Sequence, residues 1–254
     1  MISPPLRTLA EAAKQTLEET GSVEDLLHVL RGSLPAELAE RLRTGAAPNE
    51  TSALPRLATG IAALDALLGG GFPRGRVTEI TGPLSSGRTS LALALLAAAT
   101  RAGEIAAVVD AADAFDPASA AAAGIDLSRV LWARPLSPRE ALRCAERLLE
   151  ARGFGVVVLD SDVLVEPRAT GERSTSIWMR MSRSATASGT ALVLVASSMR
   201  AGPFAALSLE ARATRVHFAT RPDWLEGIDA RVVPLRNRLG GSEGSVGLQW
   251  KIAW

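Results

Sequence analysis

The chain has 254 residues, of which 47% are apolar, and it carries 28 basic against 27 acidic side chains. This length and apolar content fit one large domain with a small appendage. The single cysteine, Cys144, excludes an internal disulfide framework, and its apolar helical spacing places it in the core. No apolar run approaches the roughly 18 residues of a membrane span, and no signal peptide is evident, so we expect a cytoplasmic protein.

Charge is distributed unevenly along the chain. Residues 1–50 carry five basic and eight acidic side chains, whereas residues 165–221 carry eight arginines and three glutamates. The basic stretch fits a surface for a polyanion, and it also fits ordinary solvated loops.

The first 50 residues have the pattern of a small helical segment. Leu6, Leu9, Ala13 and Leu17 share one helical face, Ser22 can cap a second helix, and Pro35 opens a third. These helices either pack on the core or dock a partner groove or neighbouring subunit. A linker follows, so we divide the chain into a segment 1–50 and a core 51–254.

From residue 59 onward, apolar strand signals alternate with helical ones. The predicted strands are 76–81, 104–110, 129–134, 155–160 and 190–197, and the predicted helices are 87–102, 116–123, 137–151 and 172–187, preceded by a short helix that ends in three glycines. Continuous apolar strands between helices indicate an α/β fold with a mostly parallel, doubly wound sheet.

The last forty or so residues change character. RVHFAT (215–220), RVVPLRN (231–237) and GLQWKIAW (247–254) read as strands, and LGGSEGS between the last two reads as a hairpin turn. The simplest arrangement is an antiparallel extension at one sheet edge. The final strand either packs on the core or offers its free edge to a partner.

The stretch RVTEITGPLSSGRTS (76–90) has the arrangement of a phosphate-binding loop. An apolar strand leads into Gly82 and Gly87, which stand five apart as G-x-x-x-x-G requires, and a helix follows. Ser85, Ser86 and Gly87 can supply the backbone amides for a phosphate, and Thr89, followed by Ser90, a hydroxyl for Mg²⁺.

One position in this loop departs from the motif. Arg88 stands where a lysine is required, and its planar, bulkier guanidinium is not equivalent to an ammonium at a tight site. Asp160 ends the GVVVLD strand, where a carboxylate commonly assists the loop-bound Mg²⁺; it can equally cap a turn. We therefore expect ATP and Mg²⁺ to bind weakly or not at all.

Four stretches together resemble the bacterial RecA recombinases. They are residues 57–90 through the nucleotide loop, residues 108–135, the strand that ends at Asp160, and residues 231–241 (RVVPLRNRLGG). The resemblance covers nearly all of residues 57–254 in order. It implies a RecA-like core with a phosphate loop and without the RecA C-terminal domain.

The resemblance also implies altered catalytic positions. RecA-type enzymes carry a catalytic glutamate after the second core strand and a γ-phosphate-sensing glutamine after the strand at 190–197; here Ala112 and Ser198 stand at those positions. Alanine cannot orient a water, and the adjacent Asp113 is expected to point elsewhere. Together with Arg88, these changes predict a chain without catalytic residues.

Other family positions keep their positive charge. Two lysines that reach a neighbouring subunit's nucleotide in the family correspond to Arg236 and Arg238. The family's DNA-binding loops correspond to residues 162–175 and 199–213, both shorter than in the recombinase. The candidate phosphate contacts in them are Arg168, Arg173, Arg200 and Arg212.

The truncated, altered core is most similar to the ImuA group, also described as SulA-like or RecA-like. That resemblance implies an accessory role in damage-induced translesion synthesis, with an ImuB-type polymerase homologue, RecA and an error-prone replicative-type polymerase as partners, and possible contact with DNA. The main alternative is a slow DNA-dependent ATPase of the RecA class. A division inhibitor of the SulA kind and a plain DNA-binding module are further alternatives.

Overall fold

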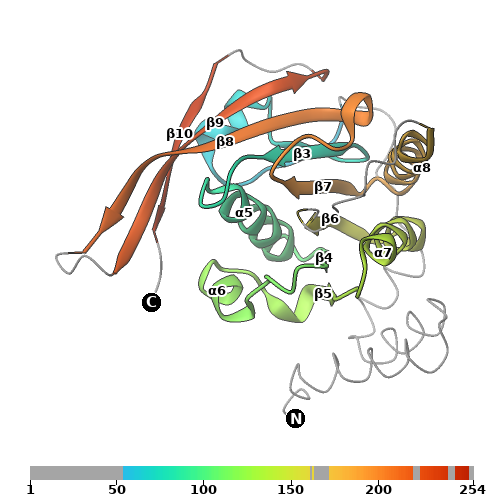
Figure 1. Ribbon diagram of the computed structural model, residues 1–254, viewed down its shortest axis with the longest axis horizontal. Helices are drawn as coiled ribbons and strands as arrows, with labels where there is room; N and C mark the ends of the chain where they lie inside the picture. The colour runs from blue at the N-terminus through green and yellow to red at the C-terminus, as the bar shows by residue number, and fades with distance from the viewer. Residues whose placement is uncertain (1–53, 161, 163–171, 220–223, 240–243, 252–254) are drawn as a thin grey trace, which may run out of the picture.

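A computed structural model describes residues 54–160, 162, 172–219, 224–239 and 244–251 (Figure 1). The predicted N-terminal helical segment and Arg168 lie outside these described residues. None of the helices in the described ranges is long and apolar enough to cross a lipid bilayer.

The core of the fold is an eight-stranded sheet with the strand order β10-β9-β8-β3-β7-β6-β4-β5. Strands β8, β3, β7, β6, β4 and β5 run parallel, and β9 and β10 are antiparallel to their neighbours. This confirms the predicted α/β class, its mostly parallel sheet and its antiparallel C-terminal edge. The strands are β3 (Val77–Thr81), β4 (Ile105–Asp110), β5 (Val130–Ala133), β6 (Phe154–Asp160), β7 (Ala191–Ala196), β8 (Ala205–Phe218), β9 (Leu225–Asn237) and β10 (Val246–Lys251).

Helices cover both faces of the sheet, as the continuous apolar strands require. On one face lie α4 (Ala62–Leu67), α5 (Arg88–Arg101) and α6 (Pro117–Ala122), and on the other lie α7 (Pro138–Ala151) and α8 (Glu172–Ser188) (Figure 1). Alternate residues of one strand therefore enter different cores, with Val158 facing α5 and Leu159 facing α7 and α8. A two-residue pair, β1 (Arg56–Leu57) with β2 (Phe72–Pro73), was not predicted.

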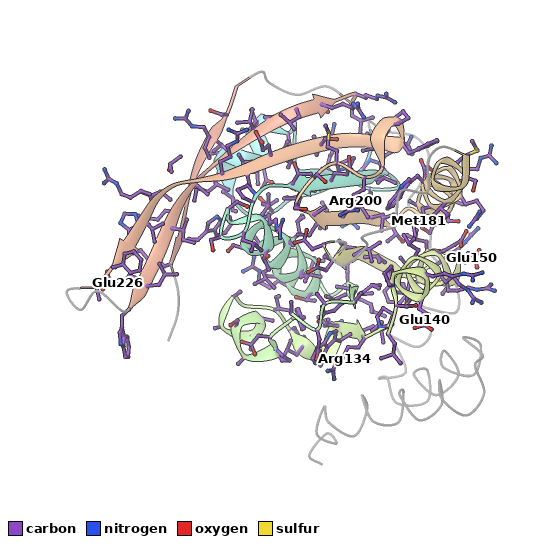
Figure 2. The ribbon with its side chains drawn as sticks, in the orientation of Figure 1. Arg134, Glu140, Glu150, Met181, Arg200 and Glu226 are labelled. Carbon is purple, nitrogen blue, oxygen red and sulfur yellow. The ribbon has the colours of Figure 1, made fainter. Side chains whose placement is uncertain are left out.

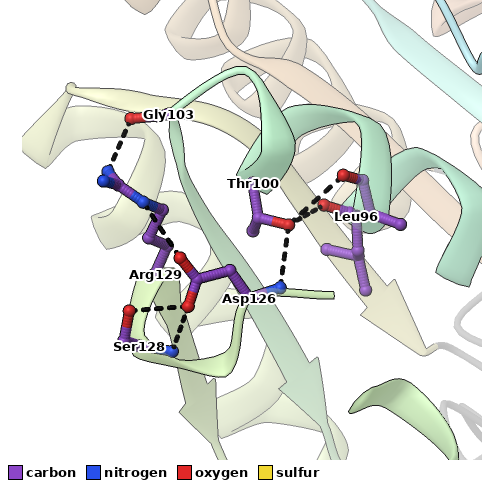
Figure 3. Close-up of polar contacts among 7 residues, drawn as sticks. Leu96, Thr100, Gly103, Asp126, Ser128 and Arg129 are labelled. Carbon is purple, nitrogen blue, oxygen red and sulfur yellow. Dashed lines mark hydrogen bonds and ion pairs between the residues drawn. The ribbon is translucent and has the colours of Figure 1, made fainter. Parts of the chain in front are cut away.

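Side-chain hydrogen bonds at helix ends agree with the predicted boundaries. Ser137 accepts a hydrogen bond from the Glu140 amide at the start of α7, as its position before Pro138 predicts. At the end of α5, Thr100 accepts the Asp126 amide, and Asp126 in turn accepts the Ser128 amide at the 3-10 turn before β5 (Figure 3). These bonds tie the turn before β5 to the end of α5.

Cys144 lies on α7, is half-buried, and packs against the core rather than within it. Burial raises the pKa of its thiol to about 12. The thiol therefore stays protonated at neutral pH and is a poor nucleophile.

Strand β8 corrects the sequence prediction. It begins at Ala205, ten residues before the expected strand, because AALSL pairs in parallel with β3 and is fully buried there. Residues 205–213 are thus strand rather than a DNA-binding loop, and Arg212 lies within β8. Beyond the body, β8, β9 and β10 continue as a twisted antiparallel extension (Figure 1).

Candidate nucleotide site

The phosphate loop, residues 82–87, lies at the carboxyl edge of the parallel strands. It follows β3, and the segments after β4, β6 and β7 reach the same edge because these strands run parallel. This edge is where ligands bind in open α/β sheets. The sequence prediction that Gly82 and Gly87 open a strand–loop–helix unit is confirmed.

Two glycines are required by the shape of the loop. Gly87 has φ +87°, and a Cβ on it would lie 2.7 Å from Nε1 of Trp250. A Cβ on Gly82 would lie 2.3 Å from the Ala211 carbonyl oxygen. The loop is therefore pressed against the C-terminal strands, and no larger residue fits at either position.

Arg88 is buried in this loop, with only 6% of its surface exposed. Its Nη1 donates to the Gly82 carbonyl at 2.6 Å, and its Nη2 makes a short ion pair with the Asp162 carboxylate. The guanidinium thus folds back across the start of its own loop. Its charge is neutralised by the protein itself.

Asp162 joins the phosphate loop to a second segment. While Oδ2 holds Arg88, Oδ1 accepts the Ser197 amide at 2.6 Å. Ser197 directly follows β7, and Asp162 follows β6. One carboxylate therefore links the segments after β3, β6 and β7. Sequence reasoning missed Asp162, although its position two residues after Asp160 was a usable signal.

Asp160 ends β6 as predicted and is half-buried. Burial raises the pKa of its carboxyl, the charges of Asp162 and Asp110 add to the increase, and Arg88 opposes it. Its Oδ1 accepts the Asp162 amide at 3.1 Å, so it caps the turn that presents Asp162. Thr89, the other candidate Mg²⁺ ligand, is exposed.

The residues of the loop fit a bound nucleotide only in part. Two buried polar atoms beside it, Ser86 Oγ and Trp250 Nε1, have no hydrogen-bond partner among the described residues, and both would suit an anion. Arg88 does not fit, because its guanidinium is directed to Gly82 and Asp162 instead of outward to a phosphate. The loop keeps the backbone of a phosphate site, while its cation is engaged internally.

Ala112 follows β4 and Ser198 follows β7; these are the two positions at which the resemblance predicts altered catalytic groups. Ala112 and Ser198 are both exposed at this edge. Asp113 is turned to the surface, where it pairs with Arg134 at 2.6 Å, beside β5 (Figure 2). Asp110, which is buried at the end of β4, accepts the Ala114 and Phe115 amides and the Trp132 indole N–H.

Sequence reasoning also missed Glu79, which is only 1% exposed in the middle of β3. Its Oε1 accepts the amides of Arg200 and Ala201 at 2.5 and 2.6 Å, and its Oε2 accepts the Ser208 hydroxyl at 3.3 Å. Glu79 therefore fixes the segment after β7, where Arg200 lies (Figure 2). An acidic residue inside the buried strand VTEIT was the available signal.

The two candidate interface cations lie away from the phosphate loop of their own chain. Arg236 pairs with Ser208, which in turn pairs with Glu79 in the middle of β3. Its Nη1 donates to the Gly202 carbonyl, and Nη1 of Arg238 donates to the Pro203 carbonyl at 2.8 Å. Within the described residues both guanidinium groups are directed to the segment after β7, and reach to a neighbouring subunit stays a prediction.

The candidate DNA contacts in the described part of the chain come from three separate segments. Arg173 lies in α8, and Arg200 lies after β7. Arg212 is exposed on β8, pairs with Glu210 at 2.8 Å, and stands directly opposite Arg231 on β9. Like charges directly opposite on a sheet are unfavourable, and the Glu210 carboxylate offsets part of this repulsion at Arg212.

The sequence matches the RecA N-terminal domain family over residues 42–201, which is more than half of the chain. Protein RecA of Chlorobaculum parvum is 48% identical over 124 residues, covering 48% of this chain and 36% of that relative. Protein RecA of Rubrobacter xylanophilus is 47% identical over 114 residues, covering 44% and 33%. The matched part thus spans about a third of the length of these curated relatives. The chain belongs to the RecA N-terminal domain family.

Proposed function

We propose that this chain is a RecA-like adaptor that does not use ATP hydrolysis to drive strand exchange. The observation that carries the proposal is the internal engagement of Arg88 by Gly82 and Asp162. A P-loop cation accelerates phosphoryl transfer by facing the β- and γ-phosphates, and this one faces a carboxylate. Ala112 supports the same conclusion because a methyl group cannot orient a water, and Ser198 supports it because a serine lacks the longer amide side chain of the family's glutamine.

The proposed setting is damage-induced translesion synthesis, as in the ImuA group. The partners in this proposal are RecA itself, an ImuB-type polymerase homologue and an error-prone replicative-type polymerase. Similarity to RecA supports the first of these, because a RecA-like core with Arg236 and Arg238 can occupy a subunit position at the end of a RecA filament. Such a subunit caps or destabilises the filament without turning over nucleotide.

Direct DNA contact is a second part of the proposal. Arg212 and Arg231 stand opposite each other at exposed positions of the antiparallel extension, and Arg212 also pairs with Glu210. Two adjacent cations on a solvent-facing sheet favour binding to a phosphate backbone, and such binding weakens with added salt.

The test is RecA assembled on single-stranded DNA and titrated with this chain below equimolar amounts. We expect co-sedimentation with the filament and a fall in the RecA ATP turnover. A variant carrying Arg236→Ala and Arg238→Ala should lose the effect, and Arg143→Ala, on the exposed face of α7, should keep it. An unchanged RecA rate without co-sedimentation would exclude the adaptor role.

A slow DNA-dependent ATPase of the RecA class is the second candidate. The unpartnered Ser86 hydroxyl and the intact glycine loop favour it. Turnover measured with and without DNA separates the two, and Arg88→Lys together with Ala112→Glu serves as the gain-of-function control.

A further inference from the structure

We propose that Arg88 and Asp162 form an internal latch that replaces the nucleotide. The latch consists of the Arg88 guanidinium, the Asp162 carboxylate, and the Gly82 carbonyl and Ser197 amide that they bind. The inference rests on the proposed loss of nucleotide dependence and gives it a cause. It assigns to Asp162 the role of an autoinhibitory positioning residue.

The geometry supports the latch because the Arg88 guanidinium and the Asp162 carboxylate each make two bonds. The Arg88 side chain bonds the first residue of the loop with one nitrogen and Asp162 with the other. Asp162 uses its second oxygen for Ser197. The Asp162 amide donates to Asp160, and this bond fixes the backbone position from which the Asp162 side chain extends.

The same three segments are those that a γ-phosphate would tie together. In nucleotide-switched proteins, the terminal phosphate orders the loops around it and releases them after hydrolysis. Here a carboxylate carries the negative charge and is part of the chain, so the order persists without ligand. The three loops are held in one arrangement that no hydrolysis step can release.

The latch also opposes anion binding at the loop. A phosphate must compete with Asp162 for Arg88, and it must approach the negative charge of that carboxylate. Removing the charge therefore removes both obstacles. The prediction is a gain of ATP binding from a substitution outside the phosphate-loop motif.

The test combines calorimetric titration with Mg–ATP and hydrogen exchange of the peptide containing Ser197, on the full chain. Asp162→Ala removes both the ion pair with Arg88 and the acceptor of the Ser197 amide. Asp162→Asn removes the charge and keeps an oxygen for the Ser197 amide. Asp113→Ala is the matched control, because Asp113 forms an exposed ion pair with Arg134 at the same sheet edge.

We expect both Asp162 variants to bind Mg–ATP at least tenfold more tightly than the parent chain. Exchange at Ser197 should accelerate at least tenfold in Asp162→Ala and by less than threefold in Asp162→Asn, with no change in Asp113→Ala. Equal ATP affinity in the parent chain and Asp162→Asn would overturn the latch. That result would leave the effect on RecA turnover unaltered, so the latch and the adaptor role fail separately.

Discussion

Replacing Glu79 is the sharpest test of how the fold shapes the candidate site. Its carboxylate is buried in β3 and accepts two backbone amides and one hydroxyl. Glu79→Gln keeps an oxygen in the place of Oε1, so both amides of the segment after β7 can still be accepted. Glu79→Ala removes the acceptor of three donors, of which the Ala201 amide and the Ser208 hydroxyl are buried.

The two variants should differ in the free energy of unfolding. Glu79→Gln loses only the charge assistance of these bonds, which corresponds to about 1–2 kcal/mol. In Glu79→Ala each unsatisfied donor costs about 1–3 kcal/mol, partly offset because no carboxylate is desolvated on folding, and the expected net loss is about 3–5 kcal/mol.

Urea unfolding of both variants measures this difference, and hydrogen exchange at Arg200 and Ala201 locates it. Exchange of these two amides should accelerate strongly in Glu79→Ala and slightly in Glu79→Gln. If both variants lose the same stability, or if Glu79→Ala loses less than about 1 kcal/mol, then Glu79 does not position the segment after β7.

Three further predictions concern a carboxyl, a glycine and an arginine pair. Burial raises the pKa of Asp160 above its usual 3.8, so ionisation disfavours the folded state; Asp160→Asn should raise the Tm at pH 7, and the gain should vanish as the pH falls below 3.8. Gly87→Ala should lower the free energy of unfolding in urea by about 2–4 kcal/mol, because its Cβ would lie 2.7 Å from an indole nitrogen. Gly103 also has a left-handed backbone but lies in open space, so Gly103→Ala should lower it by about 1–2 kcal/mol. Replacing Arg212 and Arg231 by alanine should weaken retention on single-stranded DNA and reduce the log–log salt slope by about 2; an unchanged slope would exclude this face from the contact.

The parallel core was predictable because its signals are local. Apolar runs bounded by glycine or a cap, such as the strand ending at Asp160 and the helix after Ser137, fix both the type and the ends of these elements. The phosphate loop was predictable for the same reason, since its glycines must stand at a fixed spacing before a helix.

The contacts that give the site its character were not predictable from local pattern. The pairing of Arg88 with Asp162 spans 74 positions of sequence, and that of Glu79 with Ala201 spans 122. Strand β8 was predicted to begin too late because AALSL, its first five residues, has no clear polar–apolar alternation. Its strand conformation comes from pairing with β3. Such features depend on which strands become neighbours, which a single sequence does not specify.

The most direct test of the central claim is the ATP turnover of the purified chain on single-stranded DNA, compared with the Thr89→Ala variant. Thr89 is exposed, so its replacement removes the candidate Mg²⁺ hydroxyl without disturbing the core. We predict the same background rate for both proteins, with and without DNA. DNA-stimulated turnover by the parent chain that Thr89→Ala abolishes would contradict the account and identify a working ATPase.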